Sequence, residues 1–263
     1  MASHPWFERL PKPIIIAHRG ASLDAPENTI AAFELAAVQG AEAIELDVMV
    51  CATGEPVVIH DRKVDRTTNG KGEVGGLSLT DLKALDAGSW FDSQYAGERI
   101  PSLDDVFRQL RQDTVINIEL KNDHAPLDGL PEAVAAVVRE RGCQDRIWFS
   151  SFNPIALRKI RRLVPETPAG LLLIRGGWGR IIRMLAGWIT RYDAVHPEYT
   201  DLTGDTVDAF QARGLPVFPY TINDPADLHR AVLMGVDGVI TDDPIRAAGV
   251  IRSLADPSGP TDN

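Results

Sequence analysis

Residues 43–61 read AIELDVMVCATGEPVVIHD and contain two apolar, β-branched runs that are typical of strands. The first run is Ala43–Val50, and the second, Val57-Val58-Ile59, begins after a short polar turn that contains Gly54. A turn of this length cannot hold the crossover helix that parallel strands need. The second run is therefore expected to return antiparallel to the first, as a hairpin.

The hairpin also predicts which side chains meet across the pair. With the turn centred between Thr53 and Gly54, equal steps outward along both strands place Asp47 opposite His60. A carboxylate and an imidazole are thus expected side by side.

Outside this hairpin, short strand-like runs alternate with helical patterns, which is typical of βα units around a parallel sheet. Capping side chains or prolines mark the helix starts, as at Asn153-Pro154 and Asp224-Pro225. Eight runs fit a closed (β/α)8 barrel, the TIM barrel, better than an open sheet. The predicted strands are Ile14–Ala17, Ala43–Val50, Val115–Leu120, Ile147–Ser150, Ala169–Ile174, Ala194–Pro197, Val217–Thr221 and Gly238–Thr241.

We expect residues 1–263 to form a single α/β catalytic domain with one interruption. After His60-Asp61 the chain is rich in glycine and poor in helical pattern as far as Pro101. Residues 62–100 are therefore predicted to be a small insertion after the second strand, lying over the barrel mouth.

The composition narrows the function classes. The net charge is −10 and the sequence pI is about 5.1, which argues against nucleic acid as a partner because that binding depends on Lys and Arg. The start of the chain has no signal-peptide pattern, and no run of 18 apolar residues occurs, so we expect a cytoplasmic protein. The two cysteines favour neither a disulfide framework nor a thiolate metal site.

Polar residues at the ends of barrel strands are the candidates for chemistry. The first strand ends in His18-Arg19-Gly20, where Gly20 would let the backbone turn sharply while His18 and Arg19 face the mouth. A single strand-end histidine is often only structural. Its place directly after a four-residue apolar run favours the functional interpretation.

Three carboxylates are expected on the inner face of the barrel. Glu45 and Asp47 lie two residues apart on one strand and so point the same way, and Glu119 ends the next barrel strand. Buried acids repel each other unless a cation joins them, and an oxygen-only set favours Mg²⁺ or Ca²⁺ over Zn²⁺. A structural ion pair with Lys121 is the competing interpretation.

His60 would bring a second imidazole to the same place as His18. Two histidines beside a metal-bound anion supply a general base and a general acid of nearly neutral pKa, as cleavage of a phosphodiester requires. Arg19, Lys121 and the cation would offset the charge of the phosphate.

The sequence resembles the glycerophosphodiester phosphodiesterase family, in its bacterial cytoplasmic form, over nearly its whole length. Each motif is ordinary alone, but their order is specific. The motifs are His18-Arg19-Gly20, Pro26-Glu27-Asn28-Thr29, Glu45-Leu46-Asp47-Val48, Val57-Val58-Ile59-His60-Asp61, Ile100-Pro101-Ser102-Leu103, Ile118-Glu119-Leu120-Lys121, Ser150-Ser151-Phe152, Gly235-Val236-Asp237-Gly238 and Thr241-Asp242-Asp243-Pro244.

This resemblance implies a (β/α)8 barrel and hydrolysis of glycerophosphodiesters, such as glycerophosphocholine, glycerophosphoethanolamine or glycerophosphoglycerol, to glycerol 3-phosphate and an alcohol. It implies that His18 and His60 are the acid–base pair. One divalent cation, Mg²⁺ or Ca²⁺, would be held by Glu45, Asp47 and Glu119. A glycerol hydroxyl or water would attack phosphorus. Arg19 and Lys121 would hold the phosphate, and Glu27 would be a further mouth residue.

The chain departs from the family pattern at Tyr220-Thr221-Ile222-Asn223, where Trp-Thr-Val-Asn is expected. Tyr220 keeps an aromatic face and adds a hydroxyl, so it is a candidate for packing on the substrate head group. An aromatic residue that merely closes the barrel is the alternative.

Residues 178–189 allow a second interpretation of one helix. Trp178, Trp188 and four aliphatic residues recur there at helical spacing, with arginines among them, as in a helix that lies on a membrane. A barrel helix buries the same kind of stripe, so core packing is favoured over membrane contact.

Two other functions remain open. A lysophospholipase D or sphingomyelinase D-like enzyme could use a related two-histidine site on acyl-bearing lipids, if an apolar groove led from the mouth. A non-catalytic barrel that only binds phosphodiesters is disfavoured by the intact set of histidines and acids. The sequence predicts a small-molecule phosphodiester as substrate and does not predict an oligomeric state.

Overall fold

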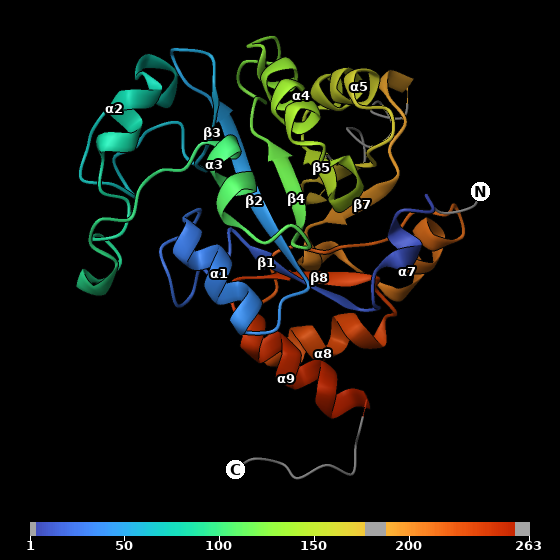
Figure 1. Cartoon of the computed structure of the whole chain (residues 1–263). Coiled ribbons are helices and arrows are strands. Elements are labelled where there is room, and N and C mark those ends of the chain that lie inside the picture. The colour runs from blue at the N-terminus through green and yellow to red at the C-terminus, as the bar shows by residue number, and fades with distance from the viewer. Residues whose placement is uncertain (1–3, 177–187, 256–263) are drawn as a thin grey trace.

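The computed structural model describes residues 4–176 and 188–255, and its centre is a curled sheet of parallel strands (Figure 1). Hydrogen-bonded neighbours follow the order β7-β6-β5-β4-β2-β1-β8, so the predicted (β/α)8 barrel is confirmed. The strands are β1 (Ile14–His18), β2 (Ala43–Val50), β3 (Pro56–Val58), β4 (Val115–Leu120), β5 (Ile147–Ser151), β6 (Ala169–Leu173), β7 (Ala194–Pro197) and β8 (Gly238–Thr241).

Helices cover the outer face of the sheet, and in Figure 1 α8 and α9 lie side by side below β8. Serine, asparagine or aspartate side chains cap the first turns of several of them, as the sequence predicts; Ser102 and Asp105 cap α3 reciprocally. The helices are α1 (Ile30–Val38), α2 (Leu79–Ala84), α3 (Leu103–Gln109), α4 (Leu130–Arg141), α5 (Pro154–Leu163), α7 (Gly204–Gln211), α8 (Pro225–Leu233) and α9 (Pro244–Ala255).

The barrel closes between β7 and β8 through a segment that is less regular than predicted. Residues 217–221 make isolated parallel bridges rather than a continuous strand. Pro216 and Pro219 have no N–H to donate, so an uninterrupted ladder cannot form there. Closure rests instead on single backbone hydrogen bonds. On one side, the N–H groups of Phe218 and Tyr220 donate to carbonyls of β7. On the other side, the N–H groups of Asp237 and Ile240 donate to the carbonyls of Val217 and Pro219.

The predicted hairpin is present, but its register differs by one residue. β3 pairs antiparallel with β2 so that Val48 faces Val58, and Asp47 therefore lies opposite Ile59 rather than His60. The predicted register is wrong because the turn is a three-residue loop centred on Thr53, with Gly54 in a left-handed conformation at φ +96°. His60 lies beyond the end of β3, where the chain is free to turn.

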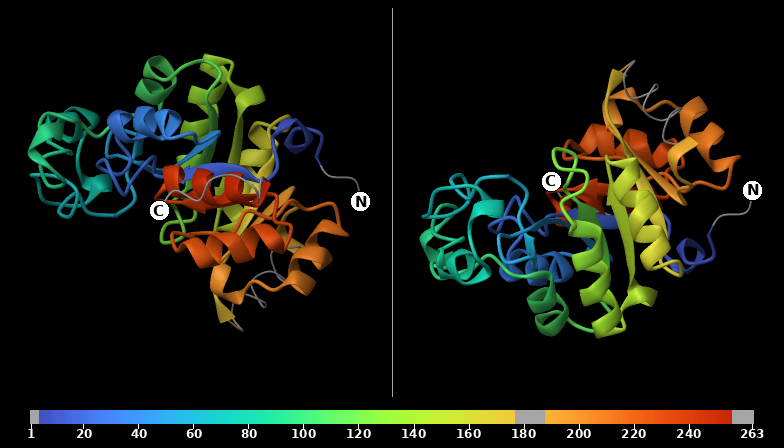
Figure 2. Two further views of the ribbon diagram at one scale, coloured as in Figure 1. Left: turned by 90° about the horizontal axis from the view of Figure 1, so that it is seen from below. Right: turned by 90° about the horizontal axis from the view of Figure 1, so that it is seen from above.

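The insertion forms a small unit beside the barrel. Figure 2 shows residues 62–100, which include α2, at one side of the barrel in the views from below and from above. Its side chains Val64, Val74 and Leu82 are buried together with Met49 of β2 and Ile59. Through these contacts the insertion is packed against the hairpin that leads to the mouth.

Aromatic side chains close the end of the barrel where the strands begin. Phe7, in a 3₁₀ turn before β1, is buried, and its ring centroid lies 5.6 Å from that of Phe218 and 6.2 Å from that of Trp148. The indole N–H of Trp6 donates to the Asp145 carbonyl at 2.9 Å. The N-terminal segment therefore acts as a plug, defined here as Trp6 and Phe7.

The helix expected at 178–189 lies largely outside the described residues, which resume at Trp188. That tryptophan is 88% exposed. Within residues 4–176 and 188–255, none of the helices has the length and apolar content needed to cross a membrane.

Candidate active site

A cavity of about 200 Å³ opens at the end of the barrel where the strands finish. Charged side chains from β1, β2 and β4 form one wall, and aromatic and aliphatic side chains form the other. The lining residues are His18, Arg19, Glu45, His60, Asn117, Glu119, Lys121, Phe152, Leu172, Tyr220, Thr221 and Ile240.

The three predicted carboxylates meet beside this cavity. β2 and β4 are parallel with Asp47 next to Glu119, and Glu45 lies one pleat earlier on the same face of β2. Oxygens of the three side chains all lie within 4.8 Å of one another, and all three residues are buried. Glu45, Asp47 and Glu119 are called the acidic triad below.

Burial and mutual repulsion perturb these acids strongly. Burial raises the pKa of Glu45 well above its usual range, and the charges of Asp47 and Glu119 add to the effect. Burial and the Asp47 charge also raise the pKa of Glu119 to about 7. Burial opposes ionisation of Asp47 too, but Arg19 and Lys121 outweigh it and lower the pKa of that carboxyl.

The acidic triad fits a divalent cation. Among the described residues, no group satisfies the buried Oε1 of Glu45 by a hydrogen bond, which is costly for a carboxylate out of contact with water. A bound cation would supply the missing partner and relieve the repulsion. Because every donor in the triad is an oxygen, a hard ion such as Mg²⁺ or Ca²⁺ fits the site.

The loop after β1 wraps around the acidic triad. Arg19 donates its backbone N–H to Glu45 at 3.0 Å, and its Nε lies 3.3 Å from Asp47 Oδ2. Asn28 donates its amide to the same Asp47 oxygen at 2.9 Å. In the described part of the chain, Arg19 and Asn28 are the two non-glycine residues with positive φ, at +58° and +59°. Unusual backbone conformations thus coincide with the site.

Gly20 makes the tight turn of this loop possible. Its φ is +84°, as the expected sharp turn requires, and a Cβ there would lie 2.6 Å from the backbone of Ala32 in α1. Any larger residue would push the loop away from the helix and displace Arg19 from Glu45.

The two predicted histidines both line the cavity, and each is held by a carboxylate through Nδ1. His18 Nδ1 lies 2.6 Å from Asp242 Oδ1, and His60 Nδ1 lies 2.7 Å from Asp61 Oδ1. With both acids ionised, Nδ1 is the donor in each pair, which leaves Nε2 of each ring without its proton in the neutral form. Burial lowers the pKa of His60, although Asp47 partly opposes this effect.

Asp242 is itself well supported. Asn223 donates its amide to Oδ2 at 2.6 Å, and the Ser22 hydroxyl donates to Oδ1 at 3.0 Å. Burial would raise the pKa of Asp242, but the hydrogen bonds from His18 and Asn223 lower it to about 2. Asp242 is therefore ionised at neutral pH and orients the ring of His18.

The other predicted residues take different places. Lys121 Nζ lies 3.0 Å from Glu119 Oε1 and 3.7 Å from Asp47 Oδ1, so the predicted ion pair and the predicted position at the mouth coexist. The Tyr220 hydroxyl donates to the Leu173 carbonyl at 2.9 Å, which leaves its ring to line the cavity. Glu27 lies behind the cavity wall, bonded to Arg19 and Arg66.

Sequence reasoning missed Asp242, Asn223, Asn28 and Arg66 as parts of the site. Asp242 was within reach, because it directly follows the last residue of β8. Arg66 carries no comparable signal, since it belongs to the irregular insertion. Its partner Glu27 is 39 residues away along the chain.

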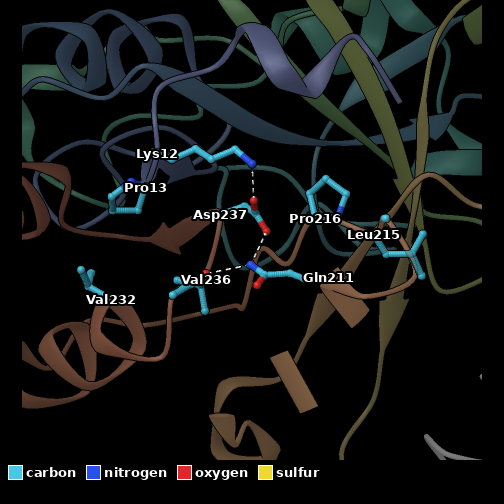
Figure 3. Close-up of a pocket in the computed structure, with 10 residues that line it drawn as sticks. Lys12, Pro13, Gln211, Leu215, Pro216, Val232, Val236 and Asp237 are labelled. Atoms are coloured by element: carbon cyan, nitrogen blue, oxygen red, sulfur yellow. Dashed lines mark hydrogen bonds and ion pairs between the residues drawn. The ribbon is translucent and has the colours of Figure 1, made fainter. Parts of the chain in front are cut away.

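A second hollow, of about 460 Å³, lies at the opposite end of the barrel (Figure 3). Its one buried acid, Asp237, is fully provided with partners: Lys12 Nζ at 2.6 Å, Gln211 Nε2 at 3.0 Å and the backbone N–H of Val217 at 2.9 Å. These bonds join the residue directly before β8 to α7, to the segment before β1 and to the segment that closes the barrel. The hollow is therefore assigned a structural role.

The family model described as the glycerophosphoryl diester phosphodiesterase family matches residues 18–246. The chain belongs to this family. Membership makes it a phosphodiesterase, that is, a hydrolase, and the matched range includes both histidines, the acidic triad and Asp242.

Similar proteins cover nearly the whole chain. A glycerophosphodiester phosphodiesterase of Caldanaerobacter subterraneus subsp. tengcongensis is 40% identical over 92% of this chain and 98% of its own. A glycerophosphodiester phosphodiesterase of Bacillus altitudinis is 34% identical over 91% and 98%.

Solved structures of this family are also similar. A phosphodiesterase from Oleispira antarctica, determined with the product sn-glycerol-3-phosphate, aligns with a TM-score of 0.82 and 34% identity over 92% of this chain and 98% of its own. A glycerophosphodiester phosphodiesterase from Agrobacterium tumefaciens aligns with a TM-score of 0.77 and 33% identity over 90% and 99%.

Proposed function

We propose that this chain hydrolyses small glycerophosphodiesters to glycerol 3-phosphate and an alcohol, with His18 and His60 as the acid–base pair and a divalent cation held by the acidic triad. The family assignment supports the bond type. The product complex of the Oleispira antarctica phosphodiesterase supports glycerol 3-phosphate as the product.

The observation that carries the proposal is that an aspartate is hydrogen-bonded to Nδ1 of each of the two histidines. Each ring is fixed by an ionised carboxylate at Nδ1, and both line one cavity of about 200 Å³ with the acidic triad. A carboxylate at Nδ1 fixes the tautomer, so Nε2 is the atom that exchanges protons with a substrate.

The two histidines would act on opposite sides of the phosphorus. His60, whose pKa is lowered by burial, is neutral at pH 7 and would take the proton of the attacking water or glycerol hydroxyl. His18, hydrogen-bonded to Asp242, would give a proton to the oxygen of the departing alcohol as the P–O bond breaks.

Cationic groups would balance the charge of the phosphate. Glu45, Asp47 and Glu119 would hold the ion, which as a Lewis acid polarises a phosphoryl oxygen when bound. Arg19 and Lys121 line the cavity next to these acids, where they would face the phosphate oxygens.

The size of the cavity favours a small substrate over an acyl-bearing lipid. Pockets for drug-sized ligands are roughly 300–1,000 Å³, and this one is about 200 Å³. Phe152, Leu172 and the ring of Tyr220 form its apolar wall, which suits the methyl or methylene groups of a head-group alcohol.

Incubation of the purified protein with glycerophosphocholine and Mg²⁺ or Ca²⁺, with a chelator control, tests the proposal. We expect glycerol 3-phosphate and choline to form only with the cation. Release of phosphocholine would reject the proposed bond, and full activity in chelator would reject the cation. Faster turnover of lysophosphatidylcholine would favour the acyl-bearing alternative, and absence of turnover would favour a binding protein.

A further inference from the structure

A single arginine of the insertion links both halves of the candidate site. Arg66 donates from Nη1 and Nη2 to the two oxygens of Glu27 at 2.7 Å and 2.8 Å. It also donates from Nε and Nη2 to the two oxygens of Asp61 at 2.7 Å and 3.2 Å. One guanidinium thus grips two carboxylates in bidentate fashion, a geometry that lysine cannot reproduce.

Each of these carboxylates continues to a residue of the cavity wall. Asp61 Oδ1 accepts from His60 Nδ1 at 2.7 Å, and Glu27 Oε1 accepts from Arg19 Nη1 at 2.9 Å. The result is a chain of contacts in the order His60, Asp61, Arg66, Glu27, Arg19. Arg66 is its central member and does not itself line the cavity.

The residues in this series of contacts differ in how far they are buried. The side chains of Glu27 and Arg19 are 13% and 17% exposed, whereas that of Arg66 is 45% exposed. Burial acts to raise the pKa of Glu27, but the hydrogen bonds from Arg66 and the charge of Arg19 outweigh it, so the pKa of Glu27 is lowered. Without Arg66, the carboxylates of Glu27 and Asp61 would lose the cation between them, and each would keep only its bond to Arg19 or His60.

We propose that Arg66 is a positioning residue that holds His60 and Arg19 in one arrangement, so that the insertion completes the active site. The proposal rests on the function proposed above for those two residues. Through Asp61, Arg66 orients the ring of His60, which would exchange protons. Through Glu27, Arg66 orients the guanidinium of Arg19, which would face the phosphate.

Arg66→Gln removes the cation and keeps a polar side chain. We expect kcat/KM for glycerophosphocholine to fall by about 10- to 100-fold, the range typical of residues that orient groups in direct contact with the reaction. Both parameters should change, kcat through His60 and KM through Arg19. Arg66→Lys should recover only part of the loss, because an ammonium cannot bridge both carboxylates.

Arg62→Gln is the matched control. Arg62 lies in the same insertion and pairs with Glu73 at 3.7 Å, with both side chains more than half exposed, so this variant makes the same change of charge without touching the chain of contacts. Its kcat and KM should stay at the wild-type values. An Arg66→Gln enzyme that matched the Arg62→Gln control would overturn the proposal.

A double-mutant cycle separates positioning from general stability. In an Asp61→Asn, Glu27→Gln background, Arg66→Gln should cost less than about threefold, because the carboxylates through which it acts no longer carry charge. An undiminished loss in that background would show that Arg66 acts by another route and would reject the proposal. Failure of the wild-type enzyme to turn over glycerophosphocholine would instead reject the proposed function.

Binding of glycerol 3-phosphate, measured by calorimetry, is a readout that does not need turnover. Arg66→Gln should weaken it relative to Arg62→Gln, since Arg19 loses its support from Glu27. Equal affinities in these two variants would remove the Arg19 branch of the proposal.

Discussion

The two ends of the barrel differ in how their charges are satisfied. At the end where the strands finish, a small cavity of about 200 Å³ lies beside three buried carboxylates, and two of them, Glu45 and Glu119, each have an oxygen with no hydrogen-bond partner among the described residues. At the end where they begin, a hollow of about 460 Å³ holds Asp237, which accepts hydrogen bonds from three groups. Unsatisfied charge, rather than volume, marks the functional end.

The aromatic plug strengthens this contrast. Trp6 and Phe7 seal the start of the strands with apolar contacts, and they leave the opposite end open and charged. Barrel enzymes in general keep stability at the first end and chemistry at the second. Substitutions at the two ends should therefore affect different properties.

His18→Ala should produce the largest effect. We expect kcat/KM to fall by about 10²- to 10⁴-fold, the usual contribution of a general acid or base. The melting temperature should stay close to that of wild type, because His18 lies at the rim of the cavity. Steady-state assays with glycerophosphocholine measure the first quantity and thermal unfolding the second. His229→Ala, at an exposed position of α8, is the control, and equal activity of the two variants would remove His18 from the mechanism.

Phe7→Ala should have the opposite profile. Removal of a buried phenylalanine typically lowers the free energy of unfolding by about 3–5 kcal/mol, because it leaves a cavity among Trp148 and Phe218. Denaturant titration measures the loss. The activity per folded molecule at low temperature should equal that of wild type, and a large fall in kcat without a loss of stability would contradict the division between the two ends.

Asp237→Asn should cause a smaller loss of stability at the same end. The amide keeps the size of the side chain but weakens the bonds to Lys12 and to the backbone of Val217, at a cost of about 1–3 kcal/mol. Chemical denaturation with an activity assay on the folded protein checks both parts. If the variant instead lost activity at unchanged stability, the larger hollow would need a functional role.

The smallest effect concerns pH and the cation. In the metal-free protein the pKa of Glu119 is about 7, so below that pH a cation must displace its proton. Release of the Glu119 proton should therefore make the affinity for Mg²⁺ or Ca²⁺ rise by up to about tenfold per pH unit below 7, and the raised pKa of Glu45 adds to this pH dependence. Calorimetric titration of the cation between about pH 5.5 and 8.5, which brackets the pKa of Glu119, measures this dependence of affinity on pH. An affinity that did not change with pH would contradict the prediction.

The raised pKa of Glu119 also affects the stability of the metal-free protein. A carboxyl whose pKa is raised by folding favours the folded state while it is protonated, and this advantage is lost as the pH rises toward the folded pKa. The metal-free protein should therefore become less stable between the ordinary glutamate pKa and about 7. Added cation should raise the melting temperature more at pH 8 than at pH 5.

Local pattern was sufficient to predict much of this molecule. The alternation of strand and helix signals led to the barrel, since each element follows from the order of apolar residues along a few turns or pleats. The spacing of Glu45 and Asp47 predicted a shared face on β2, and the position of Glu119 at the end of the next barrel strand brought it alongside. The short turn after Val50 predicted the hairpin.

Features that depend on geometry beyond the local pattern were not predictable. The hairpin register shifted by one residue because Gly54 allowed a three-residue loop, and this turned Ile59 rather than His60 toward Asp47. The pairing of His18 with Asp242 joins residues 224 positions apart, and the grip of Arg66 on Glu27 joins two irregular segments. Residues within a few positions of one another determined the elements and the acids. Only closure of the barrel brought Asp242 to His18, and only docking of the insertion brought Arg66 to Glu27, because those contacts exist in space and have no period in the chain.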